Sequence, residues 1–453
     1  MNDQEQLADL AEQQGDHYAE HLAEVNETID VITTEDVVNE KGVLVARAGT
    51  QLNRSVAKRI IQHKLTKPLE EQVRLEKSLS GTDLYQHFEN IASRYPDIKQ
   101  VNDALEFEQQ FKSMLIGQVL HPFITQKLTV LQQRMPTWFE KGIFCGWLGM
   151  LIAREIGLNQ KECFSALLAG LIHDVGFLHI DPEILNKKTQ LTPTEWRSIQ
   201  CHVVIGHTFL VSLKDLDSSI ATAVLEHHER CDGTGYPIGR EENSISITGR
   251  IIGLADSLQA IRVNQFEKCG RTLQDTVPYL QMNDLTYTAE VYRAIRAILK
   301  KANLQQTCHN PHASMKAYAL LLRKRSLLLK QCWDSLVQIT NTLAHQLDAS
   351  HDQVNQQKVT RISLHVLSKI SSAGMAGEEM ASWLDECTES QDLQILIELN
   401  KVEIMQNEII WQLNNLQKTS NIFLEALLKS TPSSHEIMAP FFVNLNEQLK
   451  QTS

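Results

Sequence analysis

Residues 218–237 read SSIATAVLEHHERCDGTGYP, which places a histidine doublet at the end of a stretch that has the pattern of a helix. The doublet, His227 and His228, is followed by Glu229 and then by the loop Asp232–Pro237. The two glycines of this loop permit backbone conformations that other residues avoid, and Pro237 stiffens its exit. His-His doublets arise by chance in a chain with 17 histidines, but this loop directly after one is uncommon.

Three more clusters of metal-binding residue types lie upstream and downstream, each in a segment that reads as helix. They are His173-Asp174 after Cys163–Leu171, His202 within Thr194–Leu213, and Asp256 within Gly249–Ala260. Imidazole nitrogens and carboxylate oxygens are natural ligands of borderline divalent metals. Adjacent residues on a helix point about 100° apart, so each doublet is able to serve two neighbouring ions. We expect four other histidines to be ordinary core or surface residues: His179, His207, His309 and His312.

The clusters and the loop resemble the signatures of a known family. His173-Asp174-Val175-Gly176 resembles the HD signature, and residues 227–237 resemble nearly the full second signature of HD-GYP domains. The elements between and after them stand in the right order: Ile180, Glu183-Ile184-Leu185, His202, Gly206, Arg250-Ile251 and Asp256. The sequence is therefore similar to the HD-GYP family over roughly residues 137–303. Asp36–Leu65 more weakly resembles the small module that often precedes such domains.

The resemblance implies a helical, metal-dependent phosphohydrolase with a centre of two or three metals, and hydrolysis of cyclic-di-GMP to the linear dinucleotide. It implies Fe or Mn as the metal, and the departures described below suggest one or two ions per chain. Asp174 is the expected bridging ligand that activates water. The full implied ligand set is His173, Asp174, His202, His227, His228 and Asp256. The implied substrate contacts are Arg250, Gly235, Tyr236, Pro237 and Arg262, and the Gly-Tyr-Pro loop is also a candidate docking surface for a diguanylate cyclase-type domain.

The chain departs from the family pattern at several positions. Where the family begins its metal set with a His, this sequence has Lys141, or Gly142 if the register slips by one. A charged Lys cannot ligate and would repel a neighbouring cation. The preceding turn offers Thr137, with Glu140 nearby, and Phe177 stands where the family has a Lys. Downstream, Gln265 and Glu267 replace basic and aromatic contacts to the dinucleotide.

Two hypotheses of different classes follow. The first is a cyclic-di-GMP phosphodiesterase of HD-GYP type with reduced activity, which the retained ligands favour. The second is an inactive sensor or adaptor that binds a cyclic dinucleotide or a protein, which Lys141 and Phe177 favour. Loss of one phosphate-stabilising group commonly costs on the order of 10²–10³ in rate. Another nucleotide as substrate is a third option.

The remaining sequence predicts a mainly α fold with four parts. Residues 1–80 form an N-terminal arm and a small α+β module, and 81–136 a helical connector. Residues 137–303 form the HD-GYP-like domain, and 312–453 a C-terminal helical bundle. In the first part, Val37-Val38 and Val43–Ala46 around a Gly-containing turn predict a hairpin, and Asn53 predicts a helix N-cap. In the last, Ser314 is expected to cap a long amphipathic helix.

Composition narrows the class of protein. With 43 Lys+Arg against 55 Asp+Glu the net charge is −12, which disfavours direct DNA binding because that binding depends on basic residues. The longest apolar run, Gly142–Ala153, is too short to span a membrane. Eight cysteines in 453 residues and no apolar leader predict a reduced, cytoplasmic protein. A homo-oligomer is left open.

Overall fold

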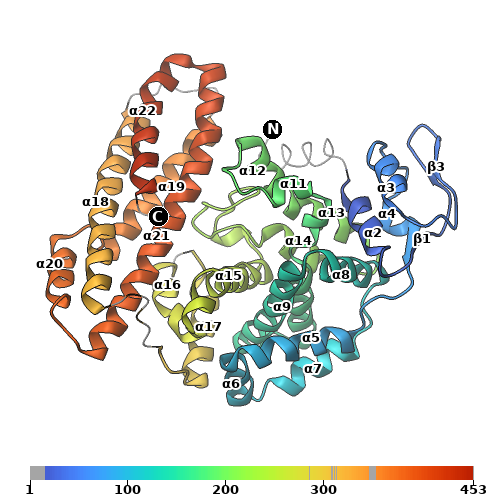
Figure 1. Cartoon of the computed structure of the whole chain (residues 1–453), viewed down its shortest axis with the longest axis horizontal. Coiled ribbons are helices and arrows are strands. Elements are labelled where there is room, and N and C mark those ends of the chain that lie inside the picture. Colours follow the sequence, from blue (N-terminus) through green and yellow to red (C-terminus); the bar gives the residue numbers. More distant parts are fainter. Residues whose placement is uncertain are drawn as a thin grey trace. The chain divides into compact units, whose positions relative to one another are not determined.

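The computed structural model describes residues 16–284, 286–307, 310, 312, 314–345 and 353–451. Residues 1–15 of the predicted N-terminal arm lie outside this range. The prediction of a mainly α protein with a small α+β segment is confirmed (Figure 1). The chain divides into two compact units. One comprises Met1–Arg230, Gly235–Ala260 and Arg293–Asn303, and the other Cys231–Thr234, Ile261–Tyr292 and Leu304–Ser453. The four-part division predicted from the sequence stays a prediction.

The first unit begins with the small module. The predicted hairpin is confirmed, with Val37 opposite Ala46 and Val38 opposite Leu44 in an antiparallel pair. The predicted N-cap is also confirmed, because the Asn53 side chain accepts hydrogen bonds from the backbone of Ser55 and Val56. A second antiparallel pair joins β1 to β4. The elements are α2 (Tyr18–Val25), β1 (Val31–Thr33), β2 (Val37–Val38), β3 (Leu44–Ala46), α3 (Arg54–Ile61), α4 (Leu69–Gln72) and β4 (Val73–Leu75).

Prolines set the boundaries of the helices that follow, since Pro96, Pro122 and Pro136 each stand at the first position of a helix. A proline is tolerated there because its missing N–H would be unpaired in any case. The helices are α5 (Gly81–Arg94), α6 (Pro96–Leu105), α7 (Glu108–Gly117), α8 (Pro122–Arg134), α9 (Pro136–Ile156) and α10 (Gln160–Ile172).

Helices α9 and α10 form the centre of the first unit. The apolar run Gly142–Ala153 lies in α9 and is buried all round. A Cβ atom on Gly170 of α10 would lie 2.5 Å from the backbone N of Gly146, so the two helices touch through their backbones. This close approach fixes the residues at the end of α10 relative to α9. None of the described helices is long and apolar enough to cross a membrane.

Short elements complete the first unit around α9 and α10. Two contacts attach α17 to the rest of this unit. Gln100 donates a hydrogen bond to the carbonyl oxygen of Ala302 in α17, and Lys301 of α17 forms an ion pair with Glu155. The elements are η1 (Val175–His179), α11 (Pro182–Leu185), α12 (Pro193–Gln200), α13 (His202–Ser212), α14 (Ser218–Glu226), η2 (Glu242–Ser244), α15 (Ile247–Ile261) and α17 (Ala289–Ala302). Ile261 of α15 and Ala289–Tyr292 of α17 are counted with the second unit.

The second unit contains the predicted C-terminal bundle, drawn in orange and red in Figure 1. Ser314 accepts a hydrogen bond from the backbone of Ala317, as expected of a cap, and α18 follows it. The helix α22 was not predicted. The elements of the second unit are η3 (Arg262–Phe266), η4 (Glu267–Cys269), η5 (Leu273–Thr276), α16 (Val277–Met282), α18 (Met315–His345), α19 (Gln353–Ser372), α20 (Glu378–Cys387), α21 (Leu393–Ser430) and α22 (Pro432–Lys450).

Candidate metal centre

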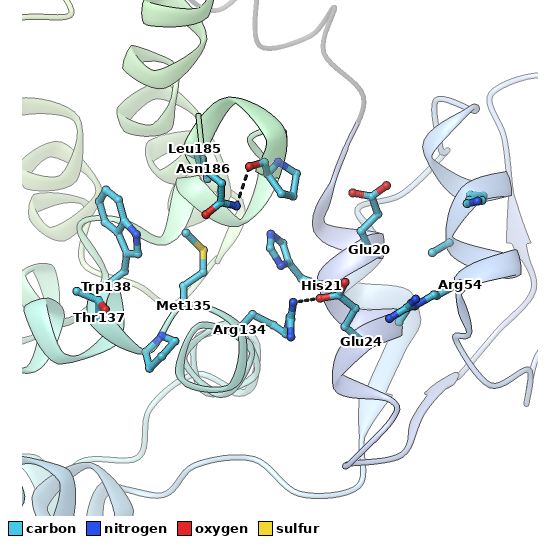
Figure 2. A pocket seen from close by; sticks show the side chains of 15 residues that line it. Glu20, His21, Glu24, Arg54, Arg134, Met135, Thr137, Trp138, Leu185 and Asn186 are labelled. Carbon is cyan, nitrogen blue, oxygen red and sulfur yellow. Dashed lines mark hydrogen bonds and ion pairs between the residues drawn. The ribbon is translucent and has the colours of Figure 1, made fainter. Parts of the chain in front are cut away.

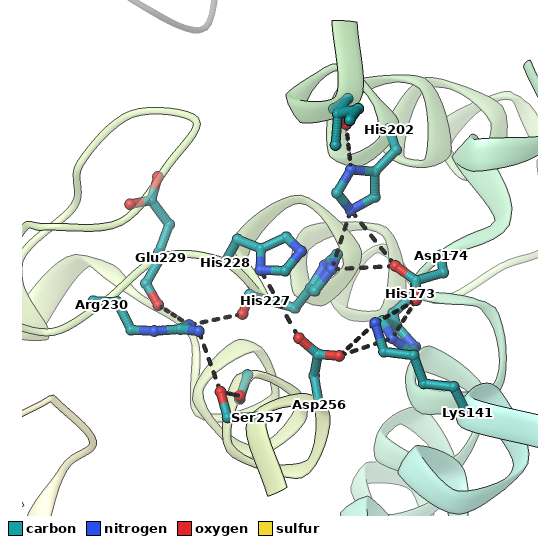
Figure 3. A network of polar contacts seen from close by, with 12 residues as sticks. Lys141, His173, Asp174, His202, His227, His228, Glu229, Arg230, Asp256 and Ser257 are labelled. Carbon is teal, nitrogen blue, oxygen red and sulfur yellow. Dashed lines mark hydrogen bonds and ion pairs between the residues drawn. The ribbon is translucent and has the colours of Figure 1, made fainter. Parts of the chain in front are cut away.

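Five of the six predicted ligands lie where a helix begins or ends, and Figure 3 shows all six converging. They are His173 and Asp174 between α10 and η1, His202 at the start of α13, and His227 and His228 after α14. The sixth, Asp256, lies inside α15. Sequence separations of up to 83 residues are thus closed by the packing of four helix ends around α15.

The last carbonyls of a helix have no partner within it, and three of the histidines supply one. The Nδ1 atoms of His173, His202 and His227 lie 2.8, 2.7 and 2.7 Å from the carbonyl oxygens of Gly170, Ile199 and Val224, respectively. A carbonyl only accepts, so each Nδ1 carries the proton. In the neutral imidazole the Nε2 lone pair then faces the centre, which is the orientation that metal-binding histidines need.

A first cluster of acceptor atoms gathers on one side of Asp174. Its Oδ1 atom lies 3.6 Å from Nε2 of His202 and 3.8 Å from Nε2 of His227, and these two nitrogens are 3.4 Å apart. Among the described residues, none donates a hydrogen bond to this buried Oδ1. Three buried acceptors that face one another without a proton between them repel, and a cation removes that repulsion. With His228, this cluster has the composition and spacing of a metal site.

A second cluster consists of Cys145, His173 and Asp256, whose possible ligand atoms also lie within 4.8 Å of one another. The ammonium of Lys141 lies among them, 2.8 Å from Oδ2 of Asp174 and 2.6 Å from Oδ1 of Asp256. Nε2 of His173 lies 2.9 Å from Oδ2 of Asp174. The carboxylates here already have a cationic partner, unlike Oδ1 of Asp174 in the first cluster.

Burial and neighbouring charges shift the pKa values of the histidines in different directions. Burial lowers the pKa of His202 to about 4, and burial together with His173 holds the pKa of His227 well below its usual value. Burial also opposes charge on His173, but the Asp174 carboxylate outweighs it and raises the pKa of His173 to about 9. Burial thus favours the neutral imidazoles of His202 and His227, whereas the Asp174 carboxylate favours the charged form of His173.

The comparisons with known proteins agree with this geometry. The HD domain family matches residues 118–291. The chain is 32% identical over 177 residues to "Cyclic di-GMP phosphodiesterase" of Thermotoga maritima, covering 36% of this chain and 47% of the relative. It is 30% identical over 168 residues to "3'3'-cGAMP-specific phosphodiesterase 3" of Vibrio cholerae, covering 37% and 36%, respectively. It is 31% identical over 147 residues to "Cyclic di-GMP phosphodiesterase PA4108" of Pseudomonas aeruginosa, covering 32% and 36%.

Residues 118–291 thus match the HD domain family, and the relatives that resemble this segment are named as cyclic-dinucleotide phosphodiesterases. The chain spans less than half the length of these curated relatives. The solved structure titled "Bd1817, a HDG"Y"P protein from Bdellovibrio bacteriovorus" aligns over 60% of this chain and 94% of its own, at 16% identity and a TM-score of 0.32. HD domains depend on metal, and the His/Asp cluster described above is a site that would hold one.

The departures of this segment from the HD-GYP pattern have structural consequences. Phe177 is buried, and its ring stacks on the imidazole of His202 with centroids 4.0 Å apart and an interplanar angle of 11°. The ring of Trp138 also packs on Phe177, with centroids 4.2 Å apart. A Cβ atom on Gly176 would lie only 2.0 Å from the carbonyl oxygen of His202. The residues after the HD pair thus hold His202 in place and bring no charge to the centre.

The Gly-Tyr-Pro loop reaches the same centre. The Tyr236 ring stacks on His228, with centroids 4.7 Å apart at an angle of 23°. A Cβ atom on Gly235 would meet the carbonyl oxygen of His228 at 2.4 Å, so the loop needs glycine to turn back against the doublet. Of the predicted substrate contacts, the structure therefore brings Tyr236 to the metal ligands. Pro237 next to it is buried.

Two charged residues of the signature position this loop, although the sequence argument gave them no role. The carboxylate of Glu229 accepts hydrogen bonds from the backbone of Ile238, Gly239 and Arg240, at 2.7, 3.2 and 2.8 Å. The guanidinium of Arg230 donates to the carbonyl oxygens of His227 and Glu229 and to Oγ of Ser257 (Figure 3). The signal in the sequence that could have identified Glu229 and Arg230 was their charge at the end of a mostly apolar helical segment.

The two basic residues among the predicted substrate contacts lie in different units, Arg250 in the first and Arg262 in the second. Nε of Arg250 donates to the carbonyl oxygen of Ile245 at 2.9 Å, which fixes its side chain within the first unit. Arg262 is buried in η3, and Gln265 accepts a hydrogen bond from Asn407, both within the second unit. The substrate roles of Arg250 and Arg262 stay predictions.

A pocket of about 670 Å³ opens near the metal centre in the first unit (Figure 2). The residues that line it include His21 of α2, Arg134 at the end of α8 and Trp138 of α9, which are labelled in Figure 2. Arg134 forms an ion pair with Glu24 across the pocket. Because Trp138 also packs on Phe177, one wall of this pocket lies two ring contacts from the ligand His202.

Proposed function

We propose that this protein hydrolyses a phosphodiester bond of a cyclic dinucleotide at a divalent metal held by Asp174, His202 and His227. The observation that supports this most directly is the unpaired Oδ1 of Asp174 facing two imidazole lone pairs at 3.6 and 3.8 Å. Such a convergence of buried acceptors is costly without a cation, and its retention favours a functional metal site.

A divalent ion at this position would supply Lewis-acid activation of water and of a phosphate oxygen. The protein residues orient and insulate it. Backbone carbonyls fix the tautomers of the three histidines, and Phe177 and Tyr236 hold the rings of His202 and His228. We assign His173, His228 and Asp256 to the remainder of the centre, with Asp174 shared between its two halves.

The substrate class follows from the names of the relatives, which act on cyclic di-GMP or 3'3'-cGAMP. We propose the same class here, with Fe or Mn as the metal and with Arg250, Arg262 and the Gly-Tyr-Pro loop as candidate contacts. The proposed location is the cytoplasm, which rests on the cysteine usage of the sequence. A diguanylate cyclase-type domain is the proposed partner of the loop.

A second candidate is a sensor or adaptor that binds the dinucleotide without hydrolysis. Two observations favour it: Phe177 brings no charge to the centre, and the ammonium of Lys141 offsets part of the negative charge of Asp174 and Asp256. Reduced charge stabilisation slows phosphoryl-group chemistry, whereas binding alone requires less of it. The two candidates differ in turnover, so one assay distinguishes them.

The test is hydrolysis of cyclic di-GMP and 3'3'-cGAMP by protein purified without chelator, with Mn²⁺ or Fe²⁺ added and products separated by chromatography. We expect linear product from the wild type and none from His202→Gln. His207→Gln on the same helix is the matched control and is expected to retain activity, because His207 is not among the residues that converge on the centre. Saturable binding without product would favour the adaptor, and neither binding nor product would refute both.

A further inference from the structure

Lys141 is the residue whose position the metal chemistry leaves unexplained. It lies in the second turn of α9 and its side chain is 19% exposed, while those of Asp174 and Asp256 are 2% and 8% exposed. Its ammonium joins Oδ2 of Asp174 at 2.8 Å to Oδ1 of Asp256 at 2.6 Å. A half-buried lysine thus places one positive charge between two buried carboxylates.

The two oxygens of Asp174 therefore serve two different partners. Oδ1 faces the imidazoles of His202 and His227 and accepts no hydrogen bond from the described residues. Oδ2 faces the ammonium of Lys141 and Nε2 of His173, at 2.8 and 2.9 Å. One carboxylate thus connects a pair of imidazole nitrogens on one side to the ammonium of Lys141 on the other.

The second cluster cannot accept a divalent ion while Lys141 stays in place. Its carboxylate ligand is Asp256, whose Oδ1 is the atom that Lys141 contacts at 2.6 Å. An ammonium at hydrogen-bond distance from a ligand atom repels a cation at that atom, and Lys has no lone pair with which to ligate while charged. The donor set of Cys145, His173 and Asp256 is therefore complete in residue type but blocked in charge.

We propose that Lys141 replaces the second metal ion of this centre, so that the protein holds one divalent ion per chain, on Asp174, His202 and His227. Lys141 is then a positioning residue that offsets one of the two negative charges of Asp174 and Asp256 and, by holding Oδ2 of Asp174, leaves Oδ1 for the single ion. This deepens the proposed function and depends on it only in that a metal binds. It also gives a physical reason to expect slow turnover, since one charge of +1 stands where +2 would stabilise more.

The test is metal content, measured by elemental analysis on protein loaded with Mn²⁺ and desalted, with Mn²⁺ electron paramagnetic resonance as a second readout. We expect one ion per chain and a mononuclear spectrum for the wild type. Lys141→His removes the ammonium and adds a ligand beside Cys145 and His173, so we expect two ions and a spin-coupled spectrum. Lys161→Met is the matched control: it removes one positive charge from an exposed lysine of the same unit and is expected to leave one ion.

Each outcome of these metal measurements either supports or overturns the proposal. Two ions in the wild type, or one ion in a folded Lys141→His variant, would overturn the proposal. If that variant does not fold, the wild-type stoichiometry and spectrum still decide between one ion and two. Two ions with hydrolysis would refute this inference and leave the phosphodiesterase proposal standing. One ion without hydrolysis would do the reverse, and no metal at all would refute both.

Discussion

Replacement of Gly176 by alanine tests how the backbone positions the metal ligands. A Cβ atom there would lie 2.0 Å from the carbonyl oxygen of His202 and 2.8 and 2.9 Å from the carbonyl carbon and Cα of the same residue. Favourable carbon contacts lie at about 3.5–4.0 Å, so η1 and the start of α13 must separate by roughly 1 Å or more. All three clashing atoms are backbone, so no side chain is able to rotate away.

Overpacking of this kind typically costs about 1–3 kcal/mol, and the all-backbone clash places Gly176→Ala at or above the top of that range. The same displacement moves His202 away from Oδ1 of Asp174, so we also expect metal affinity to fall by about 10–100-fold. Urea unfolding followed by circular dichroism and a chelator competition measure the two effects.

Gly117→Ala is the matched control, because Gly117 ends helix α7 in the same unit and a Cβ atom there has nothing within 4 Å. It is expected to be neutral or to stabilise by up to about 1 kcal/mol. Equal stability and equal metal affinity of the two variants would refute the argument that this backbone contact places the ligands.

Three further predictions concern other parts of the chain. Glu229→Gln weakens charge-assisted bonds to three backbone N–H groups and is expected to cost about 1–3 kcal/mol and to speed proteolysis of residues 231–240; unchanged cleavage would count against it. Arg271→Met leaves Glu403 without its ion partner at 2.5 Å and is expected to cost about 3 kcal/mol in urea unfolding, part of which Arg271→Met/Glu403→Met restores; a double variant no better than the single would contradict this. Burial lowers the pKa of His21 to about 4, so between pH 6.5 and 4 the unfolded chain binds more protons and stability falls with falling pH. Urea titrations at pH 7 and 5 should show about 2 kcal/mol of this loss, and His21→Gln should reduce it.

Local pattern was sufficient for much of the architecture. Asn53, Ser314 and the hairpin around residues 37–46 act through hydrogen bonds to near neighbours, and such bonds depend on residue type and short spacing alone. The missed helix α22 contains Pro440, a residue that normally argues against a helix interior.

The signature residues were identified from the sequence because their types and order are distinctive. Their geometry was not accessible in the same way. That His173, His202 and His227 each bond a carbonyl three residues earlier is a local fact, yet the convergence of their Nε2 atoms depends on how separate helices pack. From the sequence, Phe177 could be interpreted only as the loss of a charged residue. In the folded chain its ring stacks on the imidazole of His202.

Lys141 shows the division most clearly. From the sequence it was a residue unable to bind metal, because that conclusion needs only the chemistry of an ammonium. Its position between Asp174 and Asp256, at 2.8 and 2.6 Å, required the tertiary structure. The chain alone determined which ligand types are present and where helices begin. The packing of α9, α10 and α15 decided which carboxylate oxygens face an ammonium and which face imidazoles, because distances between residues far apart in sequence are set by contacts that no local pattern contains.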